Sequence, residues 1–348
     1  MAGTLRRVVL HAKSAPRREV WSNQPGPAHM APLPIRNAGM PGFMDSVWIW
    51  ASVGAAFFQA LRYAGLKVLN QRLSTQVTTY VRILFTLPLL AAYLVGILWW
   101  TGEPLPPLSQ GLVLYSAIAA ICQFVGTVLV VRLFQLGNFA VATLIIKADV
   151  IMTALIGTAF FSEVITPIGW VAIVVTMLGV IVISSRRSPA PAPTASAGGT
   201  SSAAAPALLG LSSALVYALS YLCLREGILA IDPAVGTLVR AAYAVLVMAT
   251  LSALMVGAYL LMREPRELVR MFAFPKLCWF IGTTSALGSI GWFIATALTN
   301  ASYVAAVAQV QIVFTLLLSV FYFGERIRAL EIAGIAIIVA GLALFRIA

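Results

Sequence analysis

Ionisable and amide side chains inside long apolar stretches are the residues of this chain that could do chemistry. Lys147 and Asp149 lie two residues apart near the middle of one such stretch, and Gln309 and Gln311 have the same spacing in a later one. A charge in apolar surroundings is costly unless it faces a water-filled cavity or a partner. The pattern therefore indicates a buried site that recognises a polar or ionic small molecule.

The spacing of the first pair limits how both members could be used. On a regular helix, residues two apart point about 200° away from each other, so Lys147 and Asp149 are not expected to line one narrow pocket together. We expect one to face a cavity and the other an inter-helix partner. The alternative is a structural ion pair with another helix, for example between Asp149 and Arg62 or Arg82.

Two polar stripes and two arginines are further candidates. The i, i+3, i+4 spacing places each stripe on one helix face, where it would form a cavity wall or make inter-helix hydrogen bonds. The arginines lie roughly 9 Å inside their helices, which fits charged gates at two opposite mouths or snorkelling toward the interface. The stripes are Gln59, Arg62 and Tyr63, and Tyr217, Ser220 and Tyr221; the candidate gates are Arg82 and Arg240.

The composition decides which kind of scaffold must position these residues. Of 348 residues, 61% are hydrophobic and only 10% are charged, with a mean hydropathy of +0.95. So little polar surface requires a lipid bilayer as solvent, and the predicted fold class is an all-α polytopic membrane protein. The net charge of +12 does not indicate nucleic acid binding, since the Lys and Arg are scattered between apolar runs.

Ten stretches are long and apolar enough to cross a bilayer as helices. We expect a basic tail over 1–43, a first domain over 44–185, a Pro/Ala/Ser/Gly linker over 186–206 and a second domain over 207–348. The predicted spans are 46–66, 77–100, 110–135, 139–161, 166–185, 207–229, 234–262, 275–298, 301–323 and 329–346.

The two domains are related in sequence. Polar residues at helix boundaries match between them, which chance would not readily produce. At an offset of 162 the matches include Asn138 with Asn300, Glu163 with Glu325 and Gly179 with Gly341, and at 158 they include Tyr63 with Tyr221, Lys67 with Arg225 and Arg82 with Arg240. Because each domain has five spans, an odd number, we predict two inverted-topology five-helix repeats, the arrangement of many secondary transporters.

These residues carry a resemblance to a known family. Glu163 and Glu325 close the fourth and ninth spans, and glycine follows each by sixteen residues, at Gly179 and Gly341. In this the chain resembles the drug/metabolite transporter superfamily, in its form with two EamA domains, over residues 46–346. The resemblance implies a carrier of amino acids, other metabolites, sugar phosphates or nucleotide sugars. We interpret both glutamates as structural and not as proton carriers, since a carboxylate at a helix end can reach a neighbouring helix N-terminus.

The Lys and Arg residues near helix ends predict the orientation. We expect the alternate loops that are rich in Lys and Arg to lie on the cytoplasmic side of a bacterial inner (plasma) membrane, and the chain termini to lie on the opposite side. The basic residues of the tail over 1–43 would favour a cytoplasmic N-terminus, which disagrees with this orientation. Translation from Met40 or Met44 would remove these residues and the disagreement. The rich set holds Lys67, Arg72, Arg132, Arg186, Arg187, Arg263, Arg266, Arg270, Lys276, Arg326 and Arg328; the poor set holds Arg225 and Arg346.

Several classes of chemistry lack their residues. Both histidines, His11 and His29, lie in the tail, and the three cysteines lack metal-ligand spacing. There is no phosphate-binding loop, so we expect no cofactor, no metal, no direct use of ATP and no enzymatic activity. The expected partners are a small-molecule substrate and the bilayer, and one chain with both repeats could work as a monomer.

The function expected from the residues is secondary transport of a small amphiphilic or zwitterionic metabolite such as an amino acid. Intramembrane cations outnumber Asp149, so the substrate should bear a carboxylate or phosphate, which Lys147 would hold. An exchanger of phosphorylated sugars or nucleotide sugars is the alternative if the cations converge on one pocket. A non-transporting membrane scaffold is a further alternative, and it predicts no midplane cavity.

Overall fold

The computed structural model describes residues 46–136, 147–184, 204–323 and 329–348. Within these ranges the regular structure is helical and no strand occurs. The predicted tail over 1–43, most of the predicted linker, and Asn138 and Glu325 lie outside the described residues. The all-α class expected from the composition is thus confirmed.

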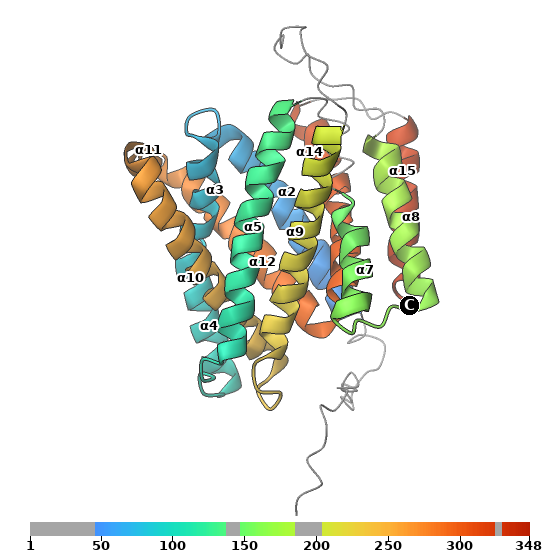
Figure 1. Ribbon diagram of the computed structural model, residues 1–348, viewed down its shortest axis with the longest axis horizontal. Coiled ribbons are helices and arrows are strands. Elements are labelled where there is room, and N and C mark those ends of the chain that lie inside the picture. Colours follow the sequence, from blue (N-terminus) through green and yellow to red (C-terminus); the bar gives the residue numbers. More distant parts are fainter. Residues whose placement is uncertain (1–45, 137–146, 185–203, 324–328) are drawn as a thin grey trace, which may run out of the picture. The chain divides into compact units, whose positions relative to one another are not determined.

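Helices α2 to α8 belong to the first half of the chain, and helices α9 to α15 to the second (Figure 1). The first half contains α2 (Val47–Leu69), α3 (Thr75–Leu84), α4 (Leu87–Thr101), α5 (Gln110–Leu136), α7 (Asp149–Phe160) and α8 (Pro167–Ser184). The second contains α9 (Ala204–Leu229), α10 (Thr237–Arg263), α11 (Pro265–Arg270), η1 (Met271–Ala273), α12 (Pro275–Leu298), α13 (Ala301–Val307), η2 (Ala308–Val310), α14 (Gln311–Phe323) and α15 (Ala329–Leu344).

Many of these helices have the length and composition of membrane spans. Among the described residues six are long and apolar enough to cross a bilayer, and three shorter ones are apolar. The six are Thr75–Thr101, Gln110–Val130, Leu208–Leu229, Thr237–Arg263, Pro275–Leu298 and Ala301–Leu318; the shorter are Asp149–Phe160, Pro167–Ile183 and Ala329–Leu344. A multi-pass membrane protein is thereby confirmed, while the count of ten spans stays a prediction.

The two ends of α10 show that the halves are inverted. This helix has 27 residues and is therefore about 40 Å long. Near its C-terminal end, the Glu264 carboxylate accepts a hydrogen bond from Ser74, just after α2. At its opposite end, Gly236 donates to Glu103, and α9 ends only a few residues before. The repeat partners α2 and α9 therefore end on opposite sides.

The second predicted span is broken in the structure, where a continuous helix was expected over 77–100. A turn at Phe85 and Thr86 separates α3 from α4, and Pro88 stands in the first turn of α4. Proline removes a backbone donor and clashes with the preceding turn, so a helix readily ends just before it. The repeat partner α10 has no proline there and is continuous.

Helices α7 and α14 begin at matched positions inside the fourth and ninth predicted spans. A turn at Lys147 and Ala148 precedes α7, and the 3₁₀ segment η2 precedes α14. Asp149 and Gln311, which are repeat partners, are the first residues of α7 and α14. Short 3₁₀ segments inside helices often mark functional sites, and transporters often place such breaks beside their substrate.

The halves interleave instead of packing as separate domains. Helix α5 lies along α9, α12 along α2, and α15 along α8 (Figure 1). In the last pair a Cβ on Gly179 would stand 2.9 Å from the carbonyl oxygen of Gly334. Glycine is needed there because any side chain would force these backbones apart. Each of these three helix pairs joins one repeat to the other.

Candidate functional site

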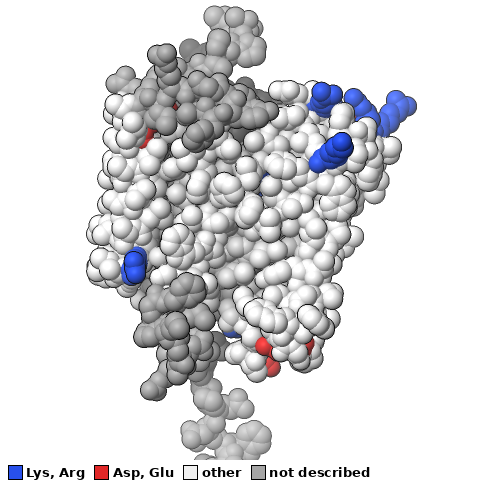
Figure 2. Space-filling model, turned by 180° about the vertical axis from the view of Figure 1, so that it is seen from behind, with Lys and Arg blue, Asp and Glu red and all other residues white. Residues whose placement is uncertain are grey.

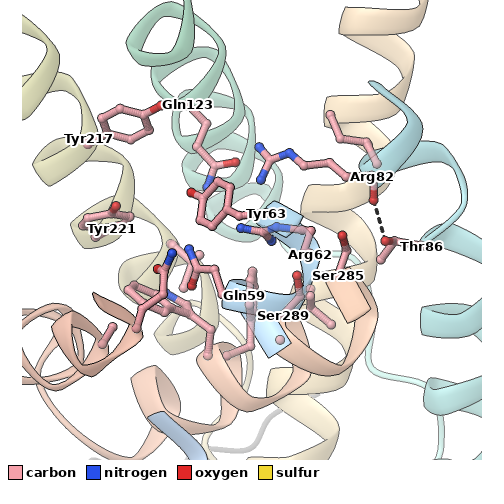
Figure 3. Close-up of a pocket in the computed structure, with 18 of the residues that line it drawn as sticks. Gln59, Arg62, Tyr63, Arg82, Thr86, Gln123, Tyr217, Tyr221, Ser285 and Ser289 are labelled. Carbon is pink, nitrogen blue, oxygen red and sulfur yellow. Dashed lines mark hydrogen bonds between the residues drawn. The ribbon is translucent and has the colours of Figure 1, made fainter. Parts of the chain in front are cut away.

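A cavity of about 650 Å³ lies between the two halves (Figure 3). This volume falls in the range of small-molecule binding sites. The cavity collects nearly all of the residues singled out in the sequence, from five helices and two helix breaks. Those that line it are Gln59, Arg62, Tyr63, Arg82, Lys147, Asp149, Tyr217, Tyr221, Gln309 and Gln311.

Lys147 and Asp149 both line the cavity, so the expectation that only one of them could do so was wrong. That expectation assumed a regular helix with about 100° between successive residues. Lys147 instead belongs to the turn that precedes α7, and Asp149 starts the helix. The break thus turns both side chains toward one space, as it does for Gln309 and Gln311.

The two arginines of the first half bring hydrogen-bond donors to the cavity without protein acceptors. Arg62 is only 6% exposed, and its guanidinium lies 5.2 Å from the ring centre of Tyr63. The Nε atoms of Arg62 and Arg82 are buried and have no hydrogen-bond partner. Neither arginine forms an ion pair with Asp149 in the described part of the chain. The alternative of such an ion pair is therefore not supported.

Acceptors without donors are found in the same cavity. Asp149 Oδ2 accepts a hydrogen bond from the Tyr221 hydroxyl at 3.4 Å, whereas Asp149 Oδ1 is buried and has no partner. Gln309 donates through Nε2 to the carbonyl of Ala305, which leaves its Oε1 buried and unpartnered. Unpartnered buried polar atoms are rare in proteins because each costs about 1–3 kcal/mol, so their occurrence around one cavity marks it as a candidate site.

One wall of the cavity is aromatic. The ring centres of Tyr217 and Tyr221 are 6.3 Å apart, and those of Tyr221 and Trp292 are 5.3 Å apart. The Tyr217 hydroxyl is 3.1 Å from Thr127 Oγ1, and its ring lies over Gly126, where a Cβ would stand 3.1 Å from it. This wall offers flat apolar surface to the body of a bound molecule.

Two predicted residues lie elsewhere. Ser220 is fully buried and donates to the Ala119 carbonyl, which is the inter-helix hydrogen bond weighed as its alternative role. Arg240 lines neither this cavity nor the second one described below, and its Nη2 donates to Thr237 Oγ1 at 3.4 Å. Of the two candidate gates, Arg82 lines both of these cavities and Arg240 lines neither.

Several lining residues were missed in the sequence. Gln123, Ser285, Ser289 and Trp292 line the cavity from α5 and α12 (Figure 3). Gln123 could have been found, because it is a lone amide inside an apolar stretch. The serines could not, since a small hydroxyl is common in membrane helices and can bond its own backbone.

A second cavity of about 330 Å³ lies between α3, α5 and α10. It shares Arg82, Ile83, Gln123 and Ser252 with the first cavity. Its other lining residues include Thr75, which begins α3, and Arg132, near the end of α5. The second cavity therefore extends from the first toward the end of the bundle where α3 begins. That end is the basic one, and Figure 2 shows Lys and Arg side chains gathered there.

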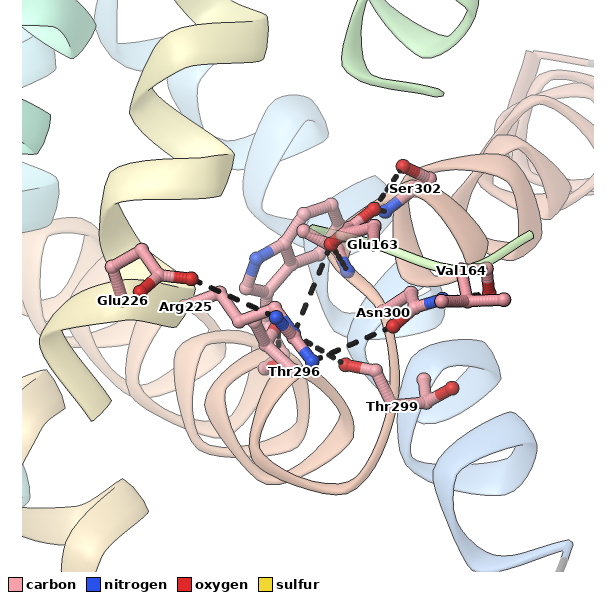
Figure 4. A network of polar contacts seen from close by, with 10 residues as sticks. Glu163, Val164, Arg225, Glu226, Thr296, Thr299, Asn300 and Ser302 are labelled. Atoms are coloured by element: carbon pink, nitrogen blue, oxygen red, sulfur yellow. Dashed lines mark hydrogen bonds and ion pairs between the residues drawn. The ribbon is translucent and has the colours of Figure 1, made fainter. Parts of the chain in front are cut away.

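Toward the opposite end the cavity has an apolar floor, formed with Leu90, Leu224, Val245, Met248 and Phe293, which belong to one buried core cluster. A polar network around Glu163 lies at that end (Figure 4). It joins the segment after α7 to α9 and to the start of α13. The fold and this cavity define a helical membrane protein with a polar site between two inverted repeats.

The chain belongs to the EamA-like transporter family. The family model matches it twice, over residues 46–185 and 204–347, once for each repeat. The family resemblance expected from the sequence is thus confirmed, and with it a membrane transporter of the drug/metabolite transporter superfamily that takes a small-molecule substrate. This family is typically non-enzymatic.

Solved structures show the same fold. A crystal structure with 15% sequence identity matches with a TM-score of 0.60, over 86% of this chain and 95% of its own. A comparison with curated proteins found no match.

Proposed function

We propose that this protein is a secondary transporter that exports or exchanges a small zwitterionic metabolite such as an amino acid. The cavity between the inverted repeats would open to one side of the membrane and then to the other, as the halves rock around the substrate. The protein would act in a bacterial inner membrane, as a monomer and without catalysis.

The observation that carries the proposal is the presence of unpartnered donors and unpartnered acceptors in one cavity. Arg62 and Arg82 offer free Nε–H groups, which suit a carboxylate. Asp149 and Gln309 offer free oxygens, which suit an ammonium group. A molecule with both groups would satisfy both sets, and Tyr217 would contact the rest. Lys147, first expected to hold the anion, would serve as a third cation.

A second candidate function has support from the lining charge. Arg62, Arg82 and Lys147 converge on the same cavity, and among its described lining residues the one carboxylate is that of Asp149. Convergence of the cations is what an exchanger of phosphorylated sugars or nucleotide sugars would need, because a phosphate carries up to two negative charges. The Asp149 carboxylate argues for the zwitterion, since its negative charge attracts an ammonium group and repels a phosphate.

The scaffold alternative has little support. It predicts no cavity at the middle of the bundle, whereas the protein has one of about 650 Å³ with charged lining. A protein without a ligand gains nothing from buried, unpartnered polar atoms, which lower the stability of the fold.

The test is thermal unfolding of the purified protein against a panel of amino acids, phosphorylated sugars, nucleotide sugars and carboxylates without an amine. A ligand at 100 times its dissociation constant stabilises the folded state by about 2.7 kcal/mol. We expect amino acids to raise the unfolding temperature, and Arg62→Gln, by weakening binding about thirtyfold, to cut the stabilisation to about a third. A shift with phosphorylated compounds alone would select the second candidate. If none of the compounds shifts the unfolding temperature while control transporters respond to their ligands, both candidate functions are contradicted.

A further inference from the structure

We propose that Glu163, Arg225 and Asn300 form a latch that keeps one end of the cavity closed, and that this latch must break before substrate can leave by that end. This inference rests on the proposed alternating access but concerns a different part of the molecule. The latch joins the first half of the chain to the second, because it ties the loop between α7 and α8 to α9 and to the start of α13, and these elements would have to separate for that end to open.

Glu163 is the centre of the latch (Figure 4). It is 2% exposed and lies in the loop between α7 and α8. Its Oε1 accepts a hydrogen bond from the Ala301 N–H at 2.7 Å, and its Oε2 accepts from the hydroxyl of Ser302 and, at 3.4 Å, from its N–H. The carboxylate of the first half thus binds the start of α13 in the second, as the structural interpretation of this glutamate required.

Arg225 and Asn300 complete the latch. Arg225 Nε is 3.8 Å from Glu163 Oε1 and donates to the carbonyl of Thr299, while its Nη2 donates to Asn300 Oδ1. Asn300 in turn donates through Nδ2 to the Val164 carbonyl at 2.9 Å. Two separate connections therefore cross between the halves, one through the Glu163 carboxylate and one through the Asn300 amide.

The latch lies directly beyond the floor of the cavity. Leu224 lines the cavity, and the next residue along α9 is Arg225. Phe293 lines it from α12, and Thr299, six residues later, lies about 9 Å further along. Apolar floor and polar latch thus succeed one another from the cavity to the end of the bundle. Opening this end requires both to part.

A charged and hydrogen-bonded network suits a reversible closure. Tightly packed apolar helices such as α8 and α15 lose their contacts when they separate, and water does not replace those contacts. The groups of the latch can instead bind water at the membrane surface when they part, so the open form is not prohibitively costly. Binding of substrate in the cavity would then supply the difference in free energy between the closed and open states.

Glu163→Gln is the variant that weakens the latch with the least change of shape. Gln can still accept from Ala301, but it has no charge for Arg225, and its amide group cannot accept from Ser302. Glu226→Gln is the matched control. Glu226 lies 3.7 Å from the same Arg225, but it belongs to the same half, so its loss removes an ion pair without touching a connection between halves.

The experiment measures access to the cavity from each side. Ser289, which lines the cavity, is replaced by Cys in a chain whose Cys122, Cys223 and Cys278 are replaced by Ala or Ser. A membrane-impermeant charged maleimide is then applied to sealed vesicles of both orientations. We expect the otherwise unaltered protein to label mainly from the side of Arg132, Glu163→Gln to gain labelling at least threefold from the opposite side, and Glu226→Gln to change neither.

Equal labelling of the parent protein from both sides would overturn the latch, as would no gain in Glu163→Gln or an equal gain in the control. Should Glu163→Gln fail to yield folded protein, Ser302→Ala removes one hydrogen bond of the latch, and the same gain in smaller degree is expected; its absence would also overturn the proposal. Labelling needs no substrate, so the latch can fail while ligand binding succeeds, and the reverse.

Discussion

The cavity and the latch are both polar, and both lie between the two halves, yet their polar atoms are treated in opposite ways. In the latch, the Glu163 carboxylate has partners on both oxygens, and Asn300 both accepts and donates. In the cavity, Arg62 Nε, Arg82 Nε and Asp149 Oδ1 are buried without any partner. Similar residue types thus satisfy one another in one place and stay unsatisfied in the other.

The difference separates polar residues that hold the fold together from those that wait for something else. A buried group with partners contributes to stability, whereas an unpartnered one lowers it, and such a cost is typical of sites kept for function. The same contrast distinguishes Ser220, which bonds the Ala119 carbonyl, from Tyr221 in the next position, which lines the cavity. Removal of groups from the two regions should therefore have opposite consequences for stability and binding.

The largest effect is expected from Glu163→Ala. The substitution leaves the Ser302 hydroxyl and the Ala301 N–H without their acceptor and removes a charge from beside Arg225. Loss of one partner from a buried charged network costs roughly 3 kcal/mol, so the unfolding temperature without ligand should fall by several degrees. Thermal unfolding in detergent measures this. An unchanged unfolding temperature would remove the contrast between the two regions.

Arg62→Gln should have the opposite profile. The affinity for an anionic ligand should fall about thirtyfold, because a charge-assisted hydrogen bond of about 2 kcal/mol is lost. The unfolding temperature without ligand should stay the same or rise, since Arg62 and Arg82 are like charges and, among the described residues, no carboxylate is paired to either. Isothermal titration and thermal unfolding of the same preparation test this. A destabilised protein with normal affinity would assign Arg62 to the structural group.

Asp149→Asn should discriminate between ligands. Loss of the charge should weaken binding of a ligand with an amine about tenfold, since a charge-assisted hydrogen bond is roughly twice as strong as a neutral one. A carboxylate of similar shape without the amine should bind as before or better. Competition between the two ligands measures the ratio. Equal weakening of both would show that Asp149 does not contact the amine.

Thr127→Val should have the smallest effect. It removes the hydroxyl 3.1 Å from the Tyr217 hydroxyl but keeps the size of the side chain. Because Tyr217 would contact the body of the ligand and neither charged group, we expect a two- to fivefold loss of affinity, worth roughly 0.5–1 kcal/mol. The same titration detects it. A loss larger than that of Arg62→Gln would indicate that recognition depends on the aromatic wall and not on the charges.

The repeat pattern made much of the fold and of the site predictable. Matched pairs such as Glu163 with Glu325 imply two related halves, and an odd number of spans in each half implies inversion. Lys147 and Asp149 could be found because charged residues are rare in apolar segments. Gln59, Arg62 and Tyr63 could be found because their spacing places them on one face of a helix. These inferences need only local periodicity and the cost of burying a charge, both of which are written in the order of residues.

The helix breaks could not be predicted in the same way. Pro88 was a visible reason for the break between α3 and α4, but the turn at Lys147 and the segment η2 contain no proline or glycine. Their backbone departs from the α-helix because of what surrounds it in the folded bundle. As a result the sequence placed Lys147 and Asp149 on opposite faces, while the fold turns both toward one cavity.

The sequence by itself determined the solvent, the two halves and the kinds of polar groups available, because composition and periodicity act along the chain. Only the tertiary structure decided which of these groups are satisfied. Glu163 and Asp149 are both buried carboxylates in the first half; their positions at the end and in the middle of an apolar stretch separate them in the sequence, but do not show which partners each one meets. One meets the start of α13 and the other faces a cavity, because hydrogen bonds and empty space depend on segments more than a hundred residues away.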